Sequence, residues 1–189
     1  MKNYLFTKTD IRNFMRNFDS VYLNIAEIWA QNSYARRSKV GAIIVKDNRI
    51  ISDGYNGTPN GFDNTCEEYH CHLSHDTSAE CPISPGITIS DKLKTNTHNC
   101  YACSGCSYSE MITKKEVLHA EANAITKLCQ STQSSEGATI YVTMSPCFEC
   151  AKLIIQAGIK RVVYREEYRE TSGIKLLKDT GIEVVHLPN

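Results

Sequence analysis

The chain has 189 residues, and its 21 basic and 21 acidic residues give a formal net charge of zero. This length suggests a single domain over residues 1–189, and the balanced charge argues against binding to nucleic acid or a membrane surface. No apolar run approaches a membrane-spanning length, and the first residues form no signal-peptide pattern. The nine cysteines are therefore expected to be reduced thiols or metal ligands in a cytoplasmic protein, not a disulfide framework.

The first predicted element is an amphipathic helix over residues 10–33, capped at Thr9 or Asp10. Its apolar residues recur at spacings of three and four, which is the period of a helix face packed on a core. These residues are Phe14, Phe18, Val21, Tyr22, Ile25, Ile28 and Trp29. A basic connector follows over residues 36–39, and it is either a solvated turn or a phosphate contact.

Two strands are predicted next, over residues 40–45 and 50–52, joined by a tight turn at 46–48. The second strand leads into Gly-Tyr-Asn-Gly at 54–57. The glycines suit a turn, and loops at strand ends often carry function.

Periodicity is lost between residues 58 and 115, where cysteines and histidines gather. Such a long loop is unusual in a compact domain unless something holds it, and a structural zinc ion is one such tie. The alternative is an insertion whose thiols are incidental. The candidate ligands are Cys66, Cys100, Cys103 and Cys106, with a neighbour of Cys71 as another option.

The remaining chain alternates between helical and strand patterns. This alternation predicts an α/β fold, in which a five-stranded mixed sheet lies between helices on both faces and the first hairpin is its antiparallel part. The predicted helices span 119–129, 147–156 and 172–179, and the predicted strands span 138–143, 161–164 and 183–186.

Two short stretches carry the candidate chemistry. His119-Ala120-Glu121 and Pro146-Cys147-Phe148-Glu149-Cys150 each stand at a predicted helix start, the second with Ser145 as its N-cap and Pro146 as its first residue. One imidazole and two thiolates from these stretches would hold a zinc ion and leave a fourth position for water, which is typical of a catalytic site. Glu121 is placed to reach that water as a proton shuttle. A redox pair, or half of a structural zinc site, is the alternative for the cysteines alone.

These stretches resemble the cytidine deaminase superfamily, and within it the deoxycytidylate deaminases. The pattern His-x-Glu followed by Pro-Cys-x-x-Cys is the zinc signature of nucleobase deaminases. The similarity extends over most of the chain outside the N-terminal residues and the cysteine-rich insertion. It is carried by residues 39–45, 54–61, 119–125, 141–152 and 154–160.

The resemblance implies a cytidine-deaminase-like fold with zinc on His119, Cys147 and Cys150 and with Glu121 shuttling protons. It also implies that Asn56 binds the deoxyribose and that the backbone of Ala120 and Ser145 meets the pyrimidine, with Tyr168 beside the base. Family members often carry a second zinc, one ligand of which precedes the Val-Gly-Ala strand. This chain has Ala35-Arg36-Arg37 there, so the insertion's own cysteines would have to supply that site.

The expected reaction is zinc-dependent hydrolysis of deoxycytidylate (dCMP) to dUMP and ammonia. The phosphate candidates are Arg36, Arg37 and Arg169. Resemblance also implies a homo-oligomer, commonly a hexamer, activated by dCTP and inhibited by dTTP. Two other readings stay open: a zinc-stabilised binding module without catalysis, and a deaminase acting on a base in RNA or DNA.

Overall fold

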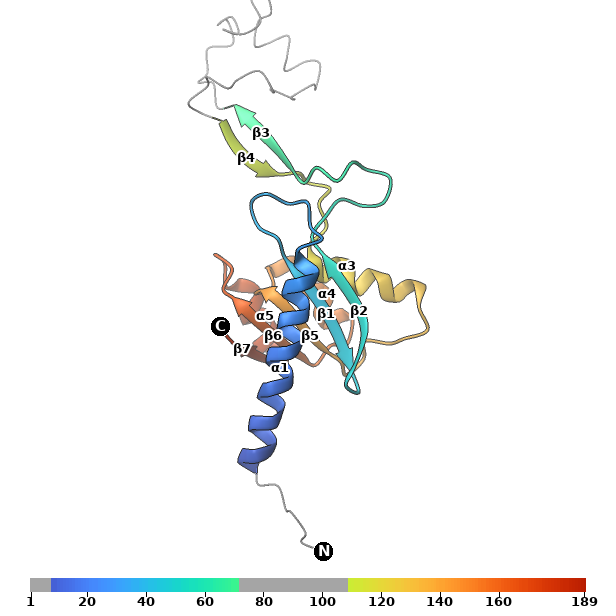
Figure 1. The fold of residues 1–189 in the computed structure, drawn as a ribbon, viewed down its shortest axis with the longest axis vertical. Helices are drawn as coiled ribbons and strands as arrows, with labels where there is room; N and C mark the ends of the chain where they lie inside the picture. The colour runs from blue at the N-terminus through green and yellow to red at the C-terminus, as the bar shows by residue number, and fades with distance from the viewer. Residues whose placement is uncertain (1–7, 72–108) are drawn as a thin grey trace, which may run out of the picture.

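The computed structural model describes residues 8–71 and 109–189, and a five-stranded mixed sheet forms its centre (Figure 1). The strand order is β2-β1-β5-β6-β7. β1 pairs antiparallel with β2 and β5, whereas β5, β6 and β7 are parallel, which confirms the predicted α/β class. The strands are β1 (Gly41–Lys46), β2 (Arg49–Tyr55), β5 (Thr139–Met144), β6 (Arg161–Glu166) and β7 (Glu183–His186).

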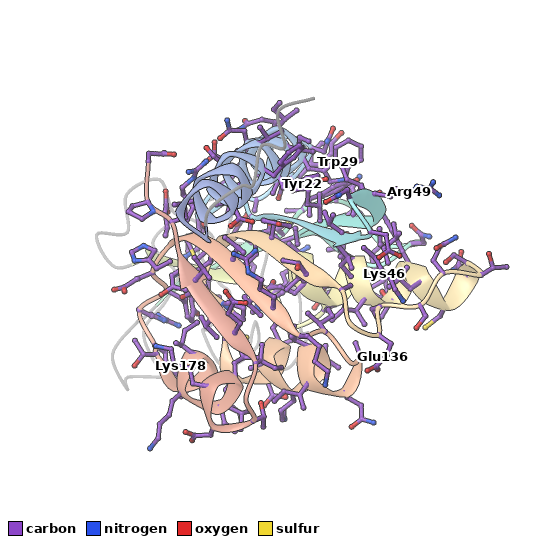
Figure 2. All side chains as sticks on the ribbon, turned by 90° about the horizontal axis from the view of Figure 1, so that it is seen from below. Tyr22, Trp29, Lys46, Arg49, Glu136 and Lys178 are labelled. Carbon is purple, nitrogen blue, oxygen red and sulfur yellow. The ribbon has the colours of Figure 1, made fainter. Side chains whose placement is uncertain are left out.

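Helices cover both faces of this sheet. Figure 2 shows α1, with Tyr22 and Trp29, on one side and α5, with Lys178, on the other. Among the described residues no helix is long and apolar enough to cross a membrane. The helices are α1 (Lys8–Ala30) on one face, and α3 (Ala120–Lys127), the 3-10 turn η1 (Leu128–Gln130), α4 (Phe148–Gln156) and α5 (Ser172–Asp179) on the other.

The sheet has a separate apolar core on each face, and β1 contributes to both. Ile43 and Val45 pack with α1, while Ala42 and Ile44 pack with the layer of α3, α4 and α5. A strand buried on both faces reads as a continuous apolar run rather than an alternating one. This is why residues 42–45 are apolar at every position.

The predicted hairpin turn is confirmed, and it is tighter than the three residues expected. Asp47 and Asn48 both have left-handed backbone angles, with φ of 49° and 59°. Two such residues form the loop whose twist matches the flanking strands. The Tyr22 hydroxyl donates a hydrogen bond to the Asn48 carbonyl at 3.2 Å, which anchors the turn to α1.

α1 differs from its prediction in start and in face. The helix already includes Lys8, so neither Thr9 nor Asp10 is its cap. Phe18, Val21 and Ile28, predicted to be core residues, are 40%, 47% and 66% exposed. The predictions of Tyr22 as buried and of Ile25 as packed on the core are confirmed, but packing on the sheet turns the helix so that residues beside the predicted stripe are buried with them. The residues buried against the sheet are Tyr22, Leu23, Ala26 and Ala30.

Two paired strands lie near the two ends of the segment that was expected to lack periodicity. β3 (Glu67–Cys71) and β4 (Ser109–Thr113) pair antiparallel as a separate two-stranded sheet. In Figure 1 this hairpin projects beyond the five-stranded sheet. Cys100, Cys103 and Cys106 lie outside the described residues.

A buried ion pair joins α1 to the sheet. Asp19 is 2% exposed, and its two carboxylate oxygens accept hydrogen bonds of 2.8 and 2.7 Å from the Arg161 guanidinium on β6. The Tyr141 hydroxyl on β5 donates to the same carboxylate at 2.8 Å. Burial and this hydrogen bond raise the pKa of Tyr141, so the phenol stays protonated and remains a donor.

Candidate active site

The two motif stretches meet where α3 and α4 begin. His119 directly precedes α3 and Cys147 directly precedes α4, and both have extended backbones with ψ of 157° and 172°. The prediction of Ser145 as the N-cap of the second helix is wrong, because the chain stays extended through Cys147. The Ser145 amide instead donates to the Glu166 carbonyl at 2.8 Å and ties the end of β5 to the end of β6.

His119, Cys147 and Cys150 form a cluster whose donor atoms all lie within 4.8 Å of one another. The His119 Nδ1 atom is 3.4 Å from the sulfur of each cysteine. Tetrahedral zinc, with bonds of roughly 2.3 Å to sulfur and 2.0–2.1 Å to nitrogen, would separate such atoms by about 3.6 Å. The residues therefore fit zinc, with Nδ1 as the ligand atom of the imidazole.

The protonation of the cluster also suits a metal. Hydrogen bonding from Cys150 and His119 lowers the pKa of the Cys147 thiol to about 3, so it is a thiolate at neutral pH. The hydrogen bond to Cys147 and burial raise the pKa of Cys150, and the hydrogen bond to Cys147 raises the pKa of His119. One proton thus stays between the two sulfurs, and a divalent ion would displace it.

Glu121 lies next to this cluster, in the first turn of α3. It is 3% exposed, and its carboxyl group interacts with the Cys150 thiol. Burial raises the pKa of Glu121 from its ordinary value of 4.5 to about 7. A carboxyl group with a pKa near neutrality can both accept and return a proton, which is the property needed of a general acid–base catalyst.

This pKa predicts how the metal-free protein responds to pH. Because the folded-state pKa of Glu121 is above its ordinary value, the folded protein binds more protons between pH 4.5 and 7, and the free energy of unfolding falls as pH rises through that window. The loss is at most about 3 kcal/mol. Thermal unfolding in chelator should therefore show Glu121→Gln gaining stability relative to wild type as pH rises. Parallel pH curves for the two proteins would contradict this expectation.

Asn56 lies in the loop that follows β2, and its side chain is fixed by the backbone. The Oδ1 atom accepts from the Val40 amide at 2.8 Å, and the Nδ2 atom donates to the Ser38 carbonyl at 2.9 Å. The Asn56 carbonyl in turn accepts from the Ser33 hydroxyl at 2.7 Å. The amide group is thus held in one orientation, and its second Nδ2 hydrogen has no partner within residues 8–71 and 109–189.

Three further predicted residues lie at or just beyond the ends of these elements, namely Ala120, Tyr168 and Arg169. Ala120 is the first residue of α3 and is fully buried. The Tyr168 amide donates to the Ser145 hydroxyl at 2.8 Å, so these two predicted residues are in direct contact. The Arg169 guanidinium lies 5.5 Å from the centre of the Tyr168 ring.

Glu67 holds the basic connector and was not identified from the sequence. Its Oε1 atom accepts from the amides of Arg36 and Arg37, at 3.0 and 3.2 Å, while both arginines are exposed. Glu67 is 8% exposed and begins β3. No local pattern signals a contact between residues 30 positions apart, so only the fold shows it.

Cys66, the named candidate ligand for the second metal whose side chain the structure describes, is 1% exposed. Burial and the neighbouring Glu67 carboxylate raise the pKa of its thiol. Within residues 8–71 and 109–189 the metal-binding cluster does not include Cys66. The structure therefore leaves the second metal site as a prediction.

Known proteins are similar to this chain in sequence. A model of the cytidine and deoxycytidylate deaminase zinc-binding region matches residues 16–166. A deoxycytidylate deaminase of Enterobacteria phage T4 is 40% identical over 181 residues, covering 89% of each chain. One from Mycobacterium phage D29 is 37% identical over 151 residues, covering 80% of this chain and 96% of its own.

A solved structure agrees with the fold as well as the sequence. The crystal structure of dCMP deaminase from the cyanophage S-TIM5, in complex with dCMP and dUMP, has a TM-score of 0.65 and 35% identity. The match covers 90% of this chain and 97% of the cyanophage chain. The ligand cluster, the buried glutamate and these similarities together show that the chain belongs to the cytidine and deoxycytidylate deaminase family.

Proposed function

We propose that this protein hydrolyses dCMP to dUMP and ammonia and so supplies dUMP for thymidylate synthesis. The observation that carries the proposal is Glu121, buried beside the cluster of His119, Cys147 and Cys150 with its pKa raised to about 7. A structural metal site has no need of such a group. The names of the relatives, and the dCMP and dUMP bound to the cyanophage enzyme, support this substrate.

The residues divide the chemistry between them. A zinc ion held by His119, Cys147 and Cys150 would lower the pKa of a bound water and supply a nucleophile at neutral pH. Glu121 accepts the proton of the attacking water as a C–O bond forms at the ring carbon that bears the amine. Glu121 gives this proton to the ring nitrogen, takes the second proton from the newly added hydroxyl group and passes it to the amine, and the C–N bond then breaks to release ammonia and leave the carbonyl.

The substrate contacts are proposed on residues that the fold already orients. Asn56 would bind the deoxyribose through the second Nδ2 hydrogen of its fixed amide. The backbone of Ala120 and Ser145 would meet the polar edge of the pyrimidine, and Tyr168 would lie beside the base. The contact between Tyr168 and Ser145 supports this placement, because it brings the two together at the ends of β5 and β6.

The phosphate is proposed to lie on Arg36, Arg37 or Arg169. All three side chains are exposed, so they are free to meet an anion. Arg36 and Arg37 are on a connector whose backbone is held by Glu67, which accepts from their amides, and by Asn56, which donates to the Ser38 carbonyl. A guanidinium group on a fixed backbone suits the recognition of phosphate oxygens.

A substrate panel tests the function. The protein should release ammonia from dCMP with a kcat/KM at least about tenfold above that for deoxycytidine, cytidine or a single-stranded oligonucleotide, since only dCMP pairs its monophosphate with an arginine. dCTP belongs in the panel to test whether a triphosphate enters the same site. Equal efficiency on the nucleoside would contradict a phosphate site. Zinc-loaded protein inactive on every cytosine compound would favour a binding module.

Replacing the candidate arginines one at a time sharpens this panel. Loss of the correct arginine should raise the KM for dCMP and leave deoxycytidine turnover unchanged. Arg49→Ala is the matched control, because Arg49 is an exposed arginine on the opposite end of β2 from the Asn56 loop. If none of the three substitutions raises the KM for dCMP while leaving deoxycytidine turnover unchanged, the phosphate is bound elsewhere.

We further propose that the enzyme is a homo-oligomer, commonly a hexamer in this family, activated by dCTP and inhibited by dTTP. Light scattering together with sigmoidal dCMP kinetics that become hyperbolic with dCTP would support this. A monomer indifferent to both triphosphates would contradict it.

A second, structural zinc is proposed on Cys66, Cys100, Cys103 and Cys106. Elemental analysis should then find more than one zinc per chain, and a single zinc in active protein would exclude it.

A further inference from the structure

Gly54 lets β2 approach the helix start that carries His119 and Glu121. A methyl group at Gly54 would lie 2.2 Å from the Ala120 carbonyl oxygen and 2.6 Å from the Ala124 amide nitrogen. Both of these are backbone atoms of α3, so no side-chain rotation relieves the overlap. Ala120 stands between His119 and Glu121, and any displacement of its carbonyl moves the metal ligand and the proton shuttle together.

Gly173 makes the corresponding contact at the other helix start. It lies in the first turn of α5, where a methyl group would be 2.3 Å from the Pro146 carbonyl oxygen and 2.7 Å from the Cys147 carbonyl carbon and oxygen. The Cys147 carbonyl accepts the first hydrogen bond of α4, from the Ala151 amide at 2.9 Å. Steric overlap with this carbonyl group would therefore displace the backbone that carries both cysteines.

We propose that Gly54 and Gly173 are positioning residues that set the separation between the two ligand-bearing helix starts. This inference rests on the zinc centre of the proposed function. Relieving either overlap requires a shift of about 0.7 Å or more, whereas metal–ligand distances in real sites hold within about 0.2 Å. A shift of the α3 start relative to the α4 start would open the 3.4 Å separations between His119 Nδ1 and the two sulfurs.

Gly41 provides a matched control. A methyl group there would lie 2.0 Å from the Ala26 carbonyl oxygen and 2.7 Å from the Ala30 amide nitrogen, so the overlap is as severe. However, this overlap would lie between β1 and α1, on the face of the sheet opposite α3 and α4. Gly41→Ala should therefore destabilise the fold by a similar mechanism without moving a metal ligand.

The test measures metal binding rather than turnover. Zinc is removed by chelation, and zinc affinity is determined by competition with a chromophoric chelator. Cobalt substitution reports the ligand geometry through its visible absorption. Gly54→Ala and Gly173→Ala should weaken zinc binding by about 10- to 100-fold and alter the cobalt spectrum, as is usual when a support of the ligands is lost. Gly41→Ala should keep wild-type affinity within about threefold and an unchanged spectrum, since no ligand support is touched.

Folding is checked by circular dichroism, and an osmolyte such as trimethylamine N-oxide is added where a variant is unstable. Wild-type affinity and spectrum in both Gly54→Ala and Gly173→Ala would overturn the inference. So would an equal loss of affinity in Gly41→Ala, or a failure of the two variants to fold in osmolyte while Gly41→Ala folds, because the glycines would then serve folding alone. Failure of the wild-type protein to bind zinc would instead overturn the proposed function.

Discussion

Glu121→Gln is expected to lower kcat for ammonia release from dCMP by about 10²- to 10⁴-fold while zinc stays bound. Glutamine has nearly the same shape but neither accepts the proton of water nor returns it to the base. Glu121 contributes no atom to the cluster of His119, Cys147 and Cys150, so the zinc content should not change. The measurement is steady-state kinetics together with elemental analysis of the same preparation.

Glu149→Gln is the control for this experiment. Glu149 also lies in the first turn of a ligand-bearing helix, but it is exposed and pairs with Lys152 at 2.6 Å. Its replacement should leave kcat unchanged and cost well under about 1 kcal/mol of stability. If Glu121→Gln retained wild-type turnover, Glu121 would have no part in proton transfer and the mechanism proposed above would be wrong.

Asp19→Ala is expected to lower the free energy of unfolding by about 3–5 kcal/mol. The substitution leaves the Arg161 guanidinium, whose side chain is 17% exposed, without its bidentate partner. It also removes the acceptor of the Tyr141 hydroxyl. Two buried polar groups thus lose a partner at once in the layer between α1 and the sheet. Chemical denaturation of the zinc-loaded protein measures the effect.

Two variants show whether the loss comes from the stranded charge. Glu183 contacts the same guanidinium at 3.2 Å, but its side chain is 64% exposed, so Glu183→Ala should cost no more than about 1 kcal/mol. The double variant Asp19→Leu with Arg161→Met removes both charges and should recover much of the stability. If the double variant is no more stable than Asp19→Ala, packing rather than charge explains the loss.

The candidate site could be predicted from the sequence because its signals are local. His119 and Glu121 are two residues apart, and Cys147 and Cys150 are three apart, so each pair reaches the site through a single helix start. The strand and helix patterns that follow residue 119 are likewise short-range, and their order predicts a sheet with parallel strands. For these elements local spacing and the final arrangement agree.

The N-cap of α4 and the buried face of α1 were less predictable from the sequence. Ser145 has the side chain of a good helix cap, yet it binds the amide of Tyr168 because β5 and β6 end side by side. α1 has apolar residues on neighbouring faces, and packing on the sheet buries Leu23, Ala26 and Ala30 while part of the predicted stripe stays exposed. In both cases local propensity allows two outcomes, and the neighbouring strand selects one.

By itself the sequence determined the α/β class, a hairpin turn within residues 46–48, and the three residues of the metal-binding cluster. These follow from residue type, backbone preference and short spacing. Only the tertiary structure decided that Glu67 holds the amides of Arg36 and Arg37, and that Gly54 and Gly173 press against the two ligand-bearing turns. Such contacts join residues far apart in the chain and are set by how closely layers pack, a quantity that no local pattern encodes.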